Sequence, residues 1–373
     1  MVALRLLDDL STERHEGEVY CCSYTPDGGY VLSAGWDGNL RLWDAATSES
    51  RLSLAVSTKP LSSCACSPDG KYWLSGSMEG LMGLWEGVSQ QAVLTFIGHT
   101  RPISSIAYAP NGQSLVTSSW DKQIHVRQVG KEREARMLNG HTDIVAGAKF
   151  TLDGKQIISW SYDGSIRLWD IELGHEVARL TGHTDRVVAL ALSPDGRFAL
   201  SGGRDATVRL WDLDERTEIA TVNLGAEVRA CFYMLDAQSV VIADVVGRLF
   251  LMAVPTFEVM SQVQTPYRVL CGELSPTGMQ LGLGAEDGLV HFVSIDGFED
   301  ASRVVTAIPI MKEQNGLIDR FLGKTRLTKT YSYTCPSCRQ VVEASALPTL
   351  PVPCPRCRRS LRVCARTPQL QGV

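Results

Sequence analysis

The sequence predicts an all-β protein in which about seven copies of one unit form the blades of a β-propeller, followed by a small cysteine-rich module. Three observations predict this. A segment ending in Leu-Trp-Asp recurs with a spacing of 42 residues or multiples of it, Asp-Gly and Asn-Gly turns recur in step with it, and four paired cysteines gather near the C-terminus. The repeats show no helical period, so each unit is expected to be a small antiparallel sheet.

Charge divides the chain in two. The 373 residues include 36 Lys and Arg and 41 Asp and Glu. Residues 301–373 hold 12 of the basic and 3 of the acidic residues, a balance of +9, which leaves −14 for residues 1–300. A hydrophobic content of 44% argues against wholesale disorder. Because no apolar run approaches the roughly 20 residues of a membrane-spanning helix and no signal peptide is evident, we expect a cytoplasmic protein without membrane contact.

An acidic residue at one turn of each unit sets the period. In the first five units it recurs every 42 residues, at Asp37, Glu79, Asp121, Asp163 and Asp205. Two weaker copies follow at intervals of 41, at Val246 and Asp287. The period therefore predicts seven units, and six is the alternative.

A second turn keeps step with the first. Ten residues before the acid stands a Pro-Asp-Gly-like turn, such as Pro26-Asp27-Gly28 or Pro194-Asp195-Gly196. Asp-Gly supplies the positive φ angles of tight hairpins, and the runs between the turns, such as Val187–Leu192, are rich in strand-forming residues. Four short strands in about 40–45 residues are typical of a propeller blade.

Over about residues 15–295 the units resemble the WD-repeat β-propeller family. The Gly-His mark of that family stands at Gly98-His99, Gly140-His141 and Gly182-His183. The resemblance implies a hydrogen-bonded network of a His, a Ser or Thr, the turn Asp and a strand Trp within each blade. Three units hold the complete set: His15, Ser33, Asp37 and Trp43; His141, Ser159, Asp163 and Trp169; His183, Ser201, Asp205 and Trp211.

The other units depart from this pattern. Unit three has Arg127 in place of the Trp, and unit two has Ser57 in place of the His and Glu79 in place of the Asp. Units six and seven keep almost none of the four residues, with Met252 and Val293 at the Trp position. A His–Asp pair often serves acid–base chemistry, but its regular repetition here favours a structural role that rigidifies each blade.

The ring needs one more strand to close its last blade. Two segments could supply it, Leu4–Leu10 from the N-terminus or Ser302–Ala307 after the last repeat, and the sequence does not decide between them. We expect the propeller to occupy residues 1–307, a linker residues 308–328 and the cysteine module residues 329–367.

The residue just before each turn acid is a candidate for partner binding, because the resemblance places it at the mouth of the central channel. In the first five units these residues are of types enriched at interface hot spots: Trp36, Met78, Trp120, Tyr162 and Arg204. The alternative is that they pack against neighbouring loops.

The cysteine module has the spacing of a zinc ribbon. Two Cys-x-x-Cys pairs are separated by 15 residues, with the cysteines at Cys335, Cys338, Cys354 and Cys357. Four thiolates leave no open position on the metal, so one structural Zn²⁺ is expected rather than a catalytic one. Iron is the chemical competitor, and redox or disulfide pairs are a third reading. Cys364 lies just outside this set.

Together these features predict a non-catalytic scaffold whose propeller face binds a protein or peptide and whose zinc ribbon is an accessory binding module. Two alternatives stay open. In one, the basic ribbon contacts DNA or RNA; in the other, the chain is a regulatory or substrate-receptor subunit of an enzyme complex. The sequence contains no His-Glu-x-x-His or Gly-x-Ser-x-Gly motif, and no small-molecule substrate is indicated.

Overall fold

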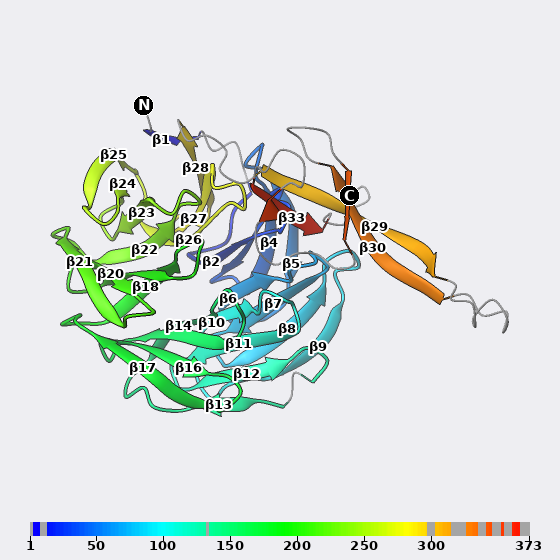
Figure 1. Ribbon diagram of the computed structural model, residues 1–373, viewed down its shortest axis with the longest axis horizontal. Helices are drawn as coiled ribbons and strands as arrows, with labels where there is room; N and C mark the ends of the chain where they lie inside the picture. Colours follow the sequence, from blue (N-terminus) through cyan, green and yellow to red (C-terminus); the bar gives the residue numbers. More distant parts are fainter. Residues whose placement is uncertain are drawn as a thin grey trace.

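The computed structural model describes residues 3–7, 13–131 and 134–296 with their side chains, and the strands at 303–314, 326–334, 341–344, 352–353 and 360–365 without them. Seven four-stranded antiparallel sheets in this part of the chain stand around a common axis (Figure 1). The predicted all-β, seven-bladed propeller is therefore confirmed. No described helix is long and apolar enough to cross a membrane.

The first three blades are meanders of consecutive strands. Blade one consists of β2 (Val19–Tyr24), β3 (Tyr30–Gly35), β4 (Asn39–Asp44) and β5 (Ser50–Ala55). Blade two consists of β6 (Leu61–Cys66), β7 (Tyr72–Ser77), β8 (Leu81–Glu86) and β9 (Ala92–Ile97). Blade three consists of β10 (Ile103–Tyr108), β11 (Ser114–Ser119), β12 (Ile124–Gln128) and β13 (Arg136–Leu138).

The next three blades repeat this plan. Blade four consists of β14 (Val145–Phe150), β15 (Gln156–Ser161), β16 (Ser165–Asp170) and β17 (His175–Thr181). Blade five consists of β18 (Val187–Leu192), β19 (Phe198–Gly203), β20 (Thr207–Asp212) and β21 (Thr217–Asn223). Blade six consists of β22 (Val228–Tyr233), β23 (Ser239–Asp244), β24 (Arg248–Ala253) and β25 (Glu258–Gln264).

Blade seven is built from both ends of the propeller. Its first three strands are β26 (Val269–Leu274), β27 (Gln280–Ala285) and β28 (Val290–Asp296), and its outer strand is β1 (Ala3–Leu6). β1 pairs antiparallel with β28, with Leu4 opposite Ile295 and both side chains buried. Of the two segments that could close the ring, the N-terminal one does so, and the edge of β28 is covered.

The first strand of each blade lies innermost and contacts the first strand of the next, from β2 through β6, β10, β14, β18, β22 and β26 back to β2. The pairing register of each innermost strand shifts just after its first residue. In all seven blades the residue after the second strand then donates its backbone N–H to the carbonyl 18 residues earlier, as Trp36 does to Glu18. These positions are therefore equivalent around one end of the ring.

Turn glycines allow neighbouring blades to approach closely. Gly38 has φ 76° in the turn between β3 and β4, and a Cβ atom there would lie 2.1 Å from the carbonyl oxygen of Ser57. No other residue fits such a contact without moving the backbone. The junction between blades one and two thus requires the Asp-Gly turn that marks the repeat in the sequence.

The blades without a complete network are packed by apolar side chains. In blades six and seven Met252 and Val293 occupy the Trp position and are almost fully buried. They belong to two large apolar clusters, one across blades five and six and the other across blades six and seven. Spacing, strand-like runs and the need to close the ring predicted these two blades, and hydrophobic packing holds them together.

A further sheet follows the propeller. Its order is β31 (Val341–Ala344), β30 (Arg326–Thr334), β29 (Arg303–Gln314), β33 (Ser360–Ala365) and β32 (Val352–Pro353). β29 begins inside the range expected for the propeller and continues into the range expected for a linker. The limits at 307, 328 and 367 remain predictions, and the four cysteines expected to bind zinc lie outside the described residues.

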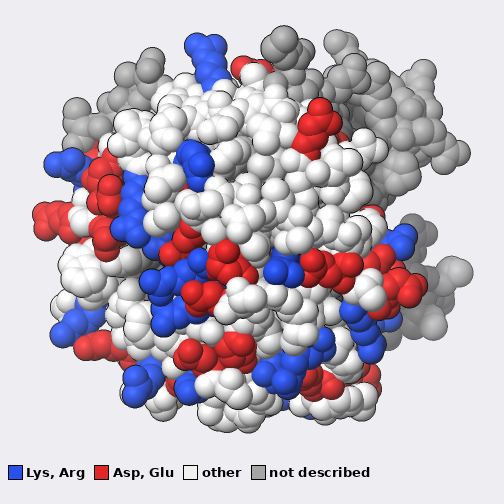
Figure 2. Space-filling view, turned by 90° about the vertical axis from the view of Figure 1, so that its left-hand side faces the viewer, with Lys and Arg blue, Asp and Glu red and all other residues white. Residues whose placement is uncertain are grey.

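Figure 2 shows the side of the propeller that is on the left in Figure 1. Acidic and basic side chains alternate over its lower part, whereas its upper part carries few charges. Two apolar residues of β25 in blade six, Val259 and Met260, are exposed. No single sign of charge dominates this side of the molecule.

Candidate functional site

Blade one joins its four network residues in a chain of hydrogen bonds. Nδ1 of His15 lies 2.8 Å from Oδ1 of Asp37, Nε2 of His15 lies 2.7 Å from Oγ of Ser33, and the indole of Trp43 donates to the same Oγ at 2.7 Å. An Nδ1-protonated imidazole satisfies all three bonds, because Ser33 then donates to Nε2 and accepts from Trp43.

Blades four and five repeat this geometry. His141 lies 2.8 Å from both Asp163 and Ser159, and Trp169 donates to Ser159 at 2.8 Å. In blade five the corresponding contacts are His183 to Asp205 at 3.0 Å, His183 to Ser201 at 2.7 Å and Trp211 to Ser201 at 2.8 Å.

The bonded order Asp, His, Ser is also that of a hydrolase triad, but the burial of these serines argues against nucleophilic chemistry. Ser33, Ser159 and Ser201 are completely buried, and each accepts an indole N–H. A nucleophilic serine must instead be open to substrate and lie beside a set of oxyanion donors. We therefore interpret the three networks as devices that hold two strands and a loop in place.

The folded environment of the networks lowers the pKa values of the aspartates and of His141. Burial alone would raise the pKa of Asp37, but hydrogen bonds and charge from His15 and nearby backbone N–H groups bring this pKa to about 2. The pKa of Asp121 is about 2 for the corresponding reasons, with His99 as its partner. Burial lowers the pKa of His141. Each of these lowered pKa values means that the side chain binds a proton less readily in the folded protein.

Blade three replaces the indole with a guanidinium. His99 lies 2.9 Å from Asp121 and 2.8 Å from Thr117, and Nη1 of Arg127 donates to Thr117 at 3.0 Å. Nη2 of Arg127 also donates to the Gly98 carbonyl at 2.7 Å. Arg127 is 4% exposed, and burial lowers its pKa to about 10. The sequence showed a missing Trp here, whereas the structure shows a substitute that makes the same bond.

Blade two keeps the Trp and Ser found in its sequence, whereas in blades six and seven Asp244 and His291, which the repeat pattern did not single out, make bonds at the turn. In blade two Trp85 donates to Ser75 at 2.9 Å although the His and Asp are absent. In blade six Asp244, two residues before the expected acid position, accepts the backbone N–H of Val246. In blade seven His291 bonds to Asp287 at 2.9 Å. A carboxylate two residues before the turn position, or a histidine four residues after it, is the signal that could have found them.

The five candidate partner-binding residues lie at one end of the ring, which we call the rim; it consists of Trp36, Met78, Trp120, Tyr162 and Arg204. Trp36 is 53% exposed, Trp120 is 41% exposed and Arg204 is also exposed. Met78 and Tyr162 are half-buried. The structure thus brings all five to equivalent places in consecutive blades, with the two largest side chains open to solvent.

Neighbouring side chains hold the rim in place. Trp36 packs against Tyr20 with ring centroids 6.3 Å apart, and a Cβ atom on Gly17 would lie 2.9 Å from Cβ of Trp36. The guanidinium of Arg186 lies 4.7 Å from the ring centroid of Tyr162. These contacts restrict the rotamers of Trp36 and Tyr162, which reduces the entropy lost on binding.

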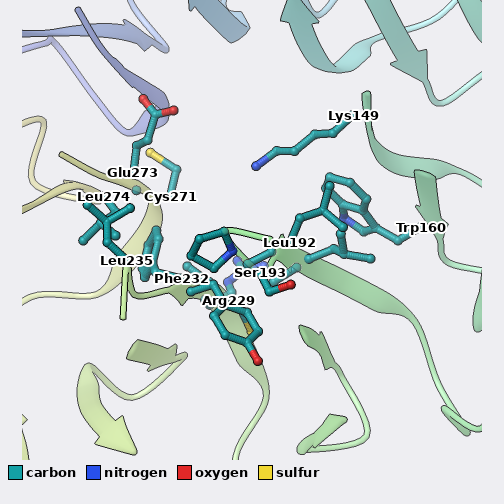
Figure 3. Close-up of a pocket in the computed structure, with 18 of the residues that line it drawn as sticks. Lys149, Trp160, Leu192, Ser193, Arg229, Phe232, Leu235, Cys271, Glu273 and Leu274 are labelled. Atoms are coloured by element: carbon teal, nitrogen blue, oxygen red, sulfur yellow. The ribbon is translucent and has the colours of Figure 1, made fainter. Parts of the chain in front are cut away.

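A cavity of about 450 Å³ lies in the centre of the ring against blades four to seven. Lys149 extends into it from one side, and Cys271 and Glu273 lie on the opposite side (Figure 3). The Glu273 carboxylate accepts the backbone N–H of Tyr24, which links blades seven and one. The lining residues include no histidine.

A second exposed apolar area is the outer strand of blade two. On β9, Val93 is 55% exposed and Ile97 is 75% exposed. This strand contains no charged residue, whereas the outer strand of every other blade has at least one. Charges on edge strands discourage pairing with other chains, so β9 is the least protected edge among the described blades.

Metal binding cannot be assigned to the described residues. They contain no group of three or more His, Cys, Asp or Glu side chains arranged to hold an ion. The pair Cys335 and Cys338 lies between β30 and β31, and the pair Cys354 and Cys357 lies between β32 and β33. Both of these strand pairs are antiparallel.

Comparisons with known proteins agree on the repeat. The family described as "WD domain, G-beta repeat" matches residues 9–44, 49–86, 90–127, 132–170 and 174–212, which is just over half of the chain. The yeast "Small ribosomal subunit protein RACK1" (Saccharomyces cerevisiae) is 52% identical over 40 residues. "Telomerase protein component 1" of Mus musculus is 50% identical over 38 residues.

These relatives match only in part. The segments cover 11% of this chain and 12% of the yeast protein, and 10% of this chain and 1% of the mouse protein. Such matches correspond to about one repeat unit. They support the assignment of this unit as a WD-type blade and say nothing of the activity of the whole chain.

Proposed function

The chain belongs to the WD domain, G-beta repeat family, and on that basis we propose that it is a non-catalytic scaffold whose rim binds a peptide or protein segment. The observation that carries this proposal is the exposure of Trp36 and Trp120 at equivalent positions at one end of the ring. Large aromatic side chains held in fixed rotamers are typical centres of protein interfaces.

The chemistry of the rim suggests what the partner presents. Blades one to four contribute aromatic and apolar side chains, and blade five contributes Arg204, which lies 3.7 Å from Glu227. A segment with apolar side chains followed by a carboxylate would match this order, because the carboxylate can compete for Arg204. The half-buried Met78 adds an adaptable surface between the two tryptophans.

The test uses peptides selected from a random displayed library on the full-length protein. The triple variant Trp36→Ser, Trp120→Ser, Tyr162→Ser should lose these peptides by at least tenfold in affinity while its circular dichroism melt stays unchanged. The matched control is Val88→Ser, Val129→Ser, Leu173→Ser, because these residues are also exposed but lie at the opposite end of the blades. Equal binding by the rim variant would rule out the rim as the binding surface.

We further propose that the cysteine module binds one structural Zn²⁺ through Cys335, Cys338, Cys354 and Cys357. Support comes from their spacing and from the antiparallel strand pairs that flank each cysteine pair. Elemental analysis of the full-length protein should find one zinc per chain and no iron. Changing Cys335 and Cys338 to Ser should remove it, and Cys364→Ser should not. A stoichiometric iron content, or full zinc in the double variant, would contradict the assignment.

A further inference from the structure

All six cysteines whose side chains the structure describes lie on innermost strands of the ring: Cys21 and Cys22 on β2, Cys64 and Cys66 on β6, Cys231 on β22 and Cys271 on β26. Two of them are in direct contact across blades. The sulfur of Cys271 lies 3.6 Å from the sulfur of Cys22, although the residues are 249 positions apart in the chain. The contact is at the junction between the last blade and the first.

The surroundings keep the two sulfurs together. Gly284 on β27 lies beside them, and a Cβ atom at this position would lie 2.4 Å from Sγ of Cys271 and 3.0 Å from Sγ of Cys22. The missing side chain therefore provides the space that both thiols occupy. A disulfide bond is about 2.05 Å long, so the sulfurs must approach by roughly 1.5 Å. Their strands are already neighbours in the ring.

Access to the pair differs between its two members. Cys271 is half-buried and lines the central cavity, where Figure 3 shows it beside Glu273. Cys22 is 6% exposed. An oxidant in the cavity therefore meets Cys271 first, and Cys22 lies behind it as the thiol that completes the reaction.

We propose that Cys22 and Cys271 form a reversible disulfide when the protein meets a peroxide. The thiol of Cys271 is oxidised to a sulfenic acid while the peroxide is reduced, with release of one water when the oxidant is hydrogen peroxide. The sulfur of Cys22 then attacks that of Cys271, the S–O bond breaks, and a second water leaves as the disulfide forms. A dithiol reductant reverses the step and is itself oxidised to a disulfide.

The bond would change how the ring is closed. Among the described residues, the strands β26–β28 are tied to blade one by non-covalent contacts, including the Tyr24 bond to Glu273 and a 2.9 Å bond from Gln280 to the carbonyl of Ala45. A disulfide between residues 249 positions apart closes almost the whole propeller covalently. Because long closed loops restrict the unfolded chain most, the oxidised protein should melt about 5 °C or more above the reduced one.

The experiment treats the full-length protein with increasing hydrogen peroxide, blocks the remaining thiols, digests the chain and maps disulfides by mass spectrometry. The expected result is a peptide pair joined through Cys22 and Cys271 that disappears with dithiothreitol, together with the higher melting temperature. Cys22→Ala and Cys271→Ala should each abolish both effects, and Cys231→Ala should abolish neither.

The mapping on the unaltered protein does not depend on how the variants fold. A map with no Cys22–Cys271 pair at full oxidation overturns the proposal. So does a map in which Cys21 joins Cys64 instead, the two thiols that lie near each other's backbone carbonyls between blades one and two. A mapped Cys22–Cys271 bond without any change in melting temperature would overturn its role in ring closure.

Discussion

Arg127 donates a hydrogen bond from Nη1 to the hydroxyl of Thr117 at 3.0 Å, in the place where other blades use an indole. In blade one the corresponding bond runs from Trp43 to Ser33 at 2.7 Å. The guanidinium is nearly fully buried, and within the described residues its charge is balanced by a carbonyl, by Asp121 nearby and by the ring of Phe96 at 5.6 Å. Blade three thus keeps the geometry of the network with a residue of different chemistry.

Removal of the Arg127 guanidinium should lower the free energy of unfolding more than removal of a surface guanidinium. Arg127→Ala leaves the Thr117 hydroxyl without its guanidinium donor and the Gly98 carbonyl with only Nδ1 of His125, both in a buried site, so we expect a loss of about 2–3 kcal/mol in the free energy of unfolding. Urea denaturation of the purified protein measures this. Arg51→Ala provides the control, because Arg51 is a surface arginine whose ion pairs are exposed and its loss should cost below about 1 kcal/mol.

A tryptophan at position 127 should be tolerated better when residue 125 is changed as well. Four residues after the turn acid, blade three has His125, whereas blades one, four and five have Arg41, Arg167 and Arg209. Arg127→Trp combined with His125→Arg therefore recreates the sequence of those blades. The double variant should be more stable than either single variant, with a coupling of about 1 kcal/mol in a double-mutant cycle. Strictly additive effects would show that the two positions do not act as one unit.

Acid should weaken blade three in a defined pH range. The pKa of His125 is lowered to about 4 by burial first, and then by the charges of His99 and Arg127. Its ring lies 3.9 Å from that of His99, and its Nδ1 lies 2.9 Å from Nη2 of Arg127. In the unfolded chain the His125 side chain binds a proton near pH 6.5. The stability that neutral His125 contributes is therefore lost as the pH falls from about 6.5 to 4.

The measurement is urea unfolding at pH 7.0 and pH 4.5. We expect His125→Asn to reduce the loss of stability between these two values by on the order of 2 kcal/mol, whatever its stability at pH 7. The carboxylates of Asp37 and Asp121 affect stability at lower pH. Because their pKa values are about 2, they stabilise the folded state above pH 4 and lose that contribution as the pH falls toward 2. An unchanged pH 7.0 to 4.5 difference in the variant would show that another group titrates there.

Local patterns in the sequence predicted the blades well because they act over short distances. The turn acid at Asp163 and the hairpin turn ten residues before it lie in one unit, and their spacing sets the strands between them. The network of His141, Ser159 and Trp169 spans fewer than 30 residues, and the structure brings these side chains together. For blades six and seven the prediction rested on spacing, strand-like runs and the need to close the ring, and in the structure buried apolar residues such as Met252 stabilise them.

Contacts between segments that are distant in the chain could not be predicted from the sequence. Both Leu4–Leu10 and Ser302–Ala307 have strand-forming residues, and only the long-range pairing of Leu4 with Ile295 distinguishes them. The role of Arg127 also depends on three-dimensional reach, because a long guanidinium and an indole place a donor at the same point. The Cys22–Cys271 contact joins opposite ends of the propeller sequence, so neither residue carries a local signal.

The orientation of Trp36 should depend on a glycine beside it. Gly17 has φ 131°, and a Cβ atom there would lie 2.9 Å from Cβ of Trp36. We expect Gly17→Ala to push the indole from its place and to weaken rim-selected peptides about tenfold, equivalent to 1.4 kcal/mol. The control is Gly225→Ala, because Gly225 also has a positive φ, 74°, but has open space around it. Equal peptide binding by the two variants would show that the orientation of Trp36 does not determine the affinity for peptides.

The closing strand offers the sharpest test of the ring. Leu4 on β1 is 6% exposed and packs in the same apolar cluster as Ile295 and Val293 of β28. Leu4→Ala should lower the free energy of unfolding by about 2–4 kcal/mol because it leaves a cavity in that cluster, whereas Arg5→Ala on the exposed side of the same strand should have little effect. Urea denaturation distinguishes the two variants.

A chain lacking residues 1–7 should expose the edge of β28 and self-associate, which light scattering detects. A synthetic peptide of residues 1–10 should restore the monomer by pairing with β28 in the register of the intact chain, with Leu4 opposite Ile295. A peptide with Leu4→Asp is the matched control, since a buried carboxylate cannot enter the apolar cluster. If the truncated chain stays monomeric and as stable as the full chain, β1 does not close the propeller.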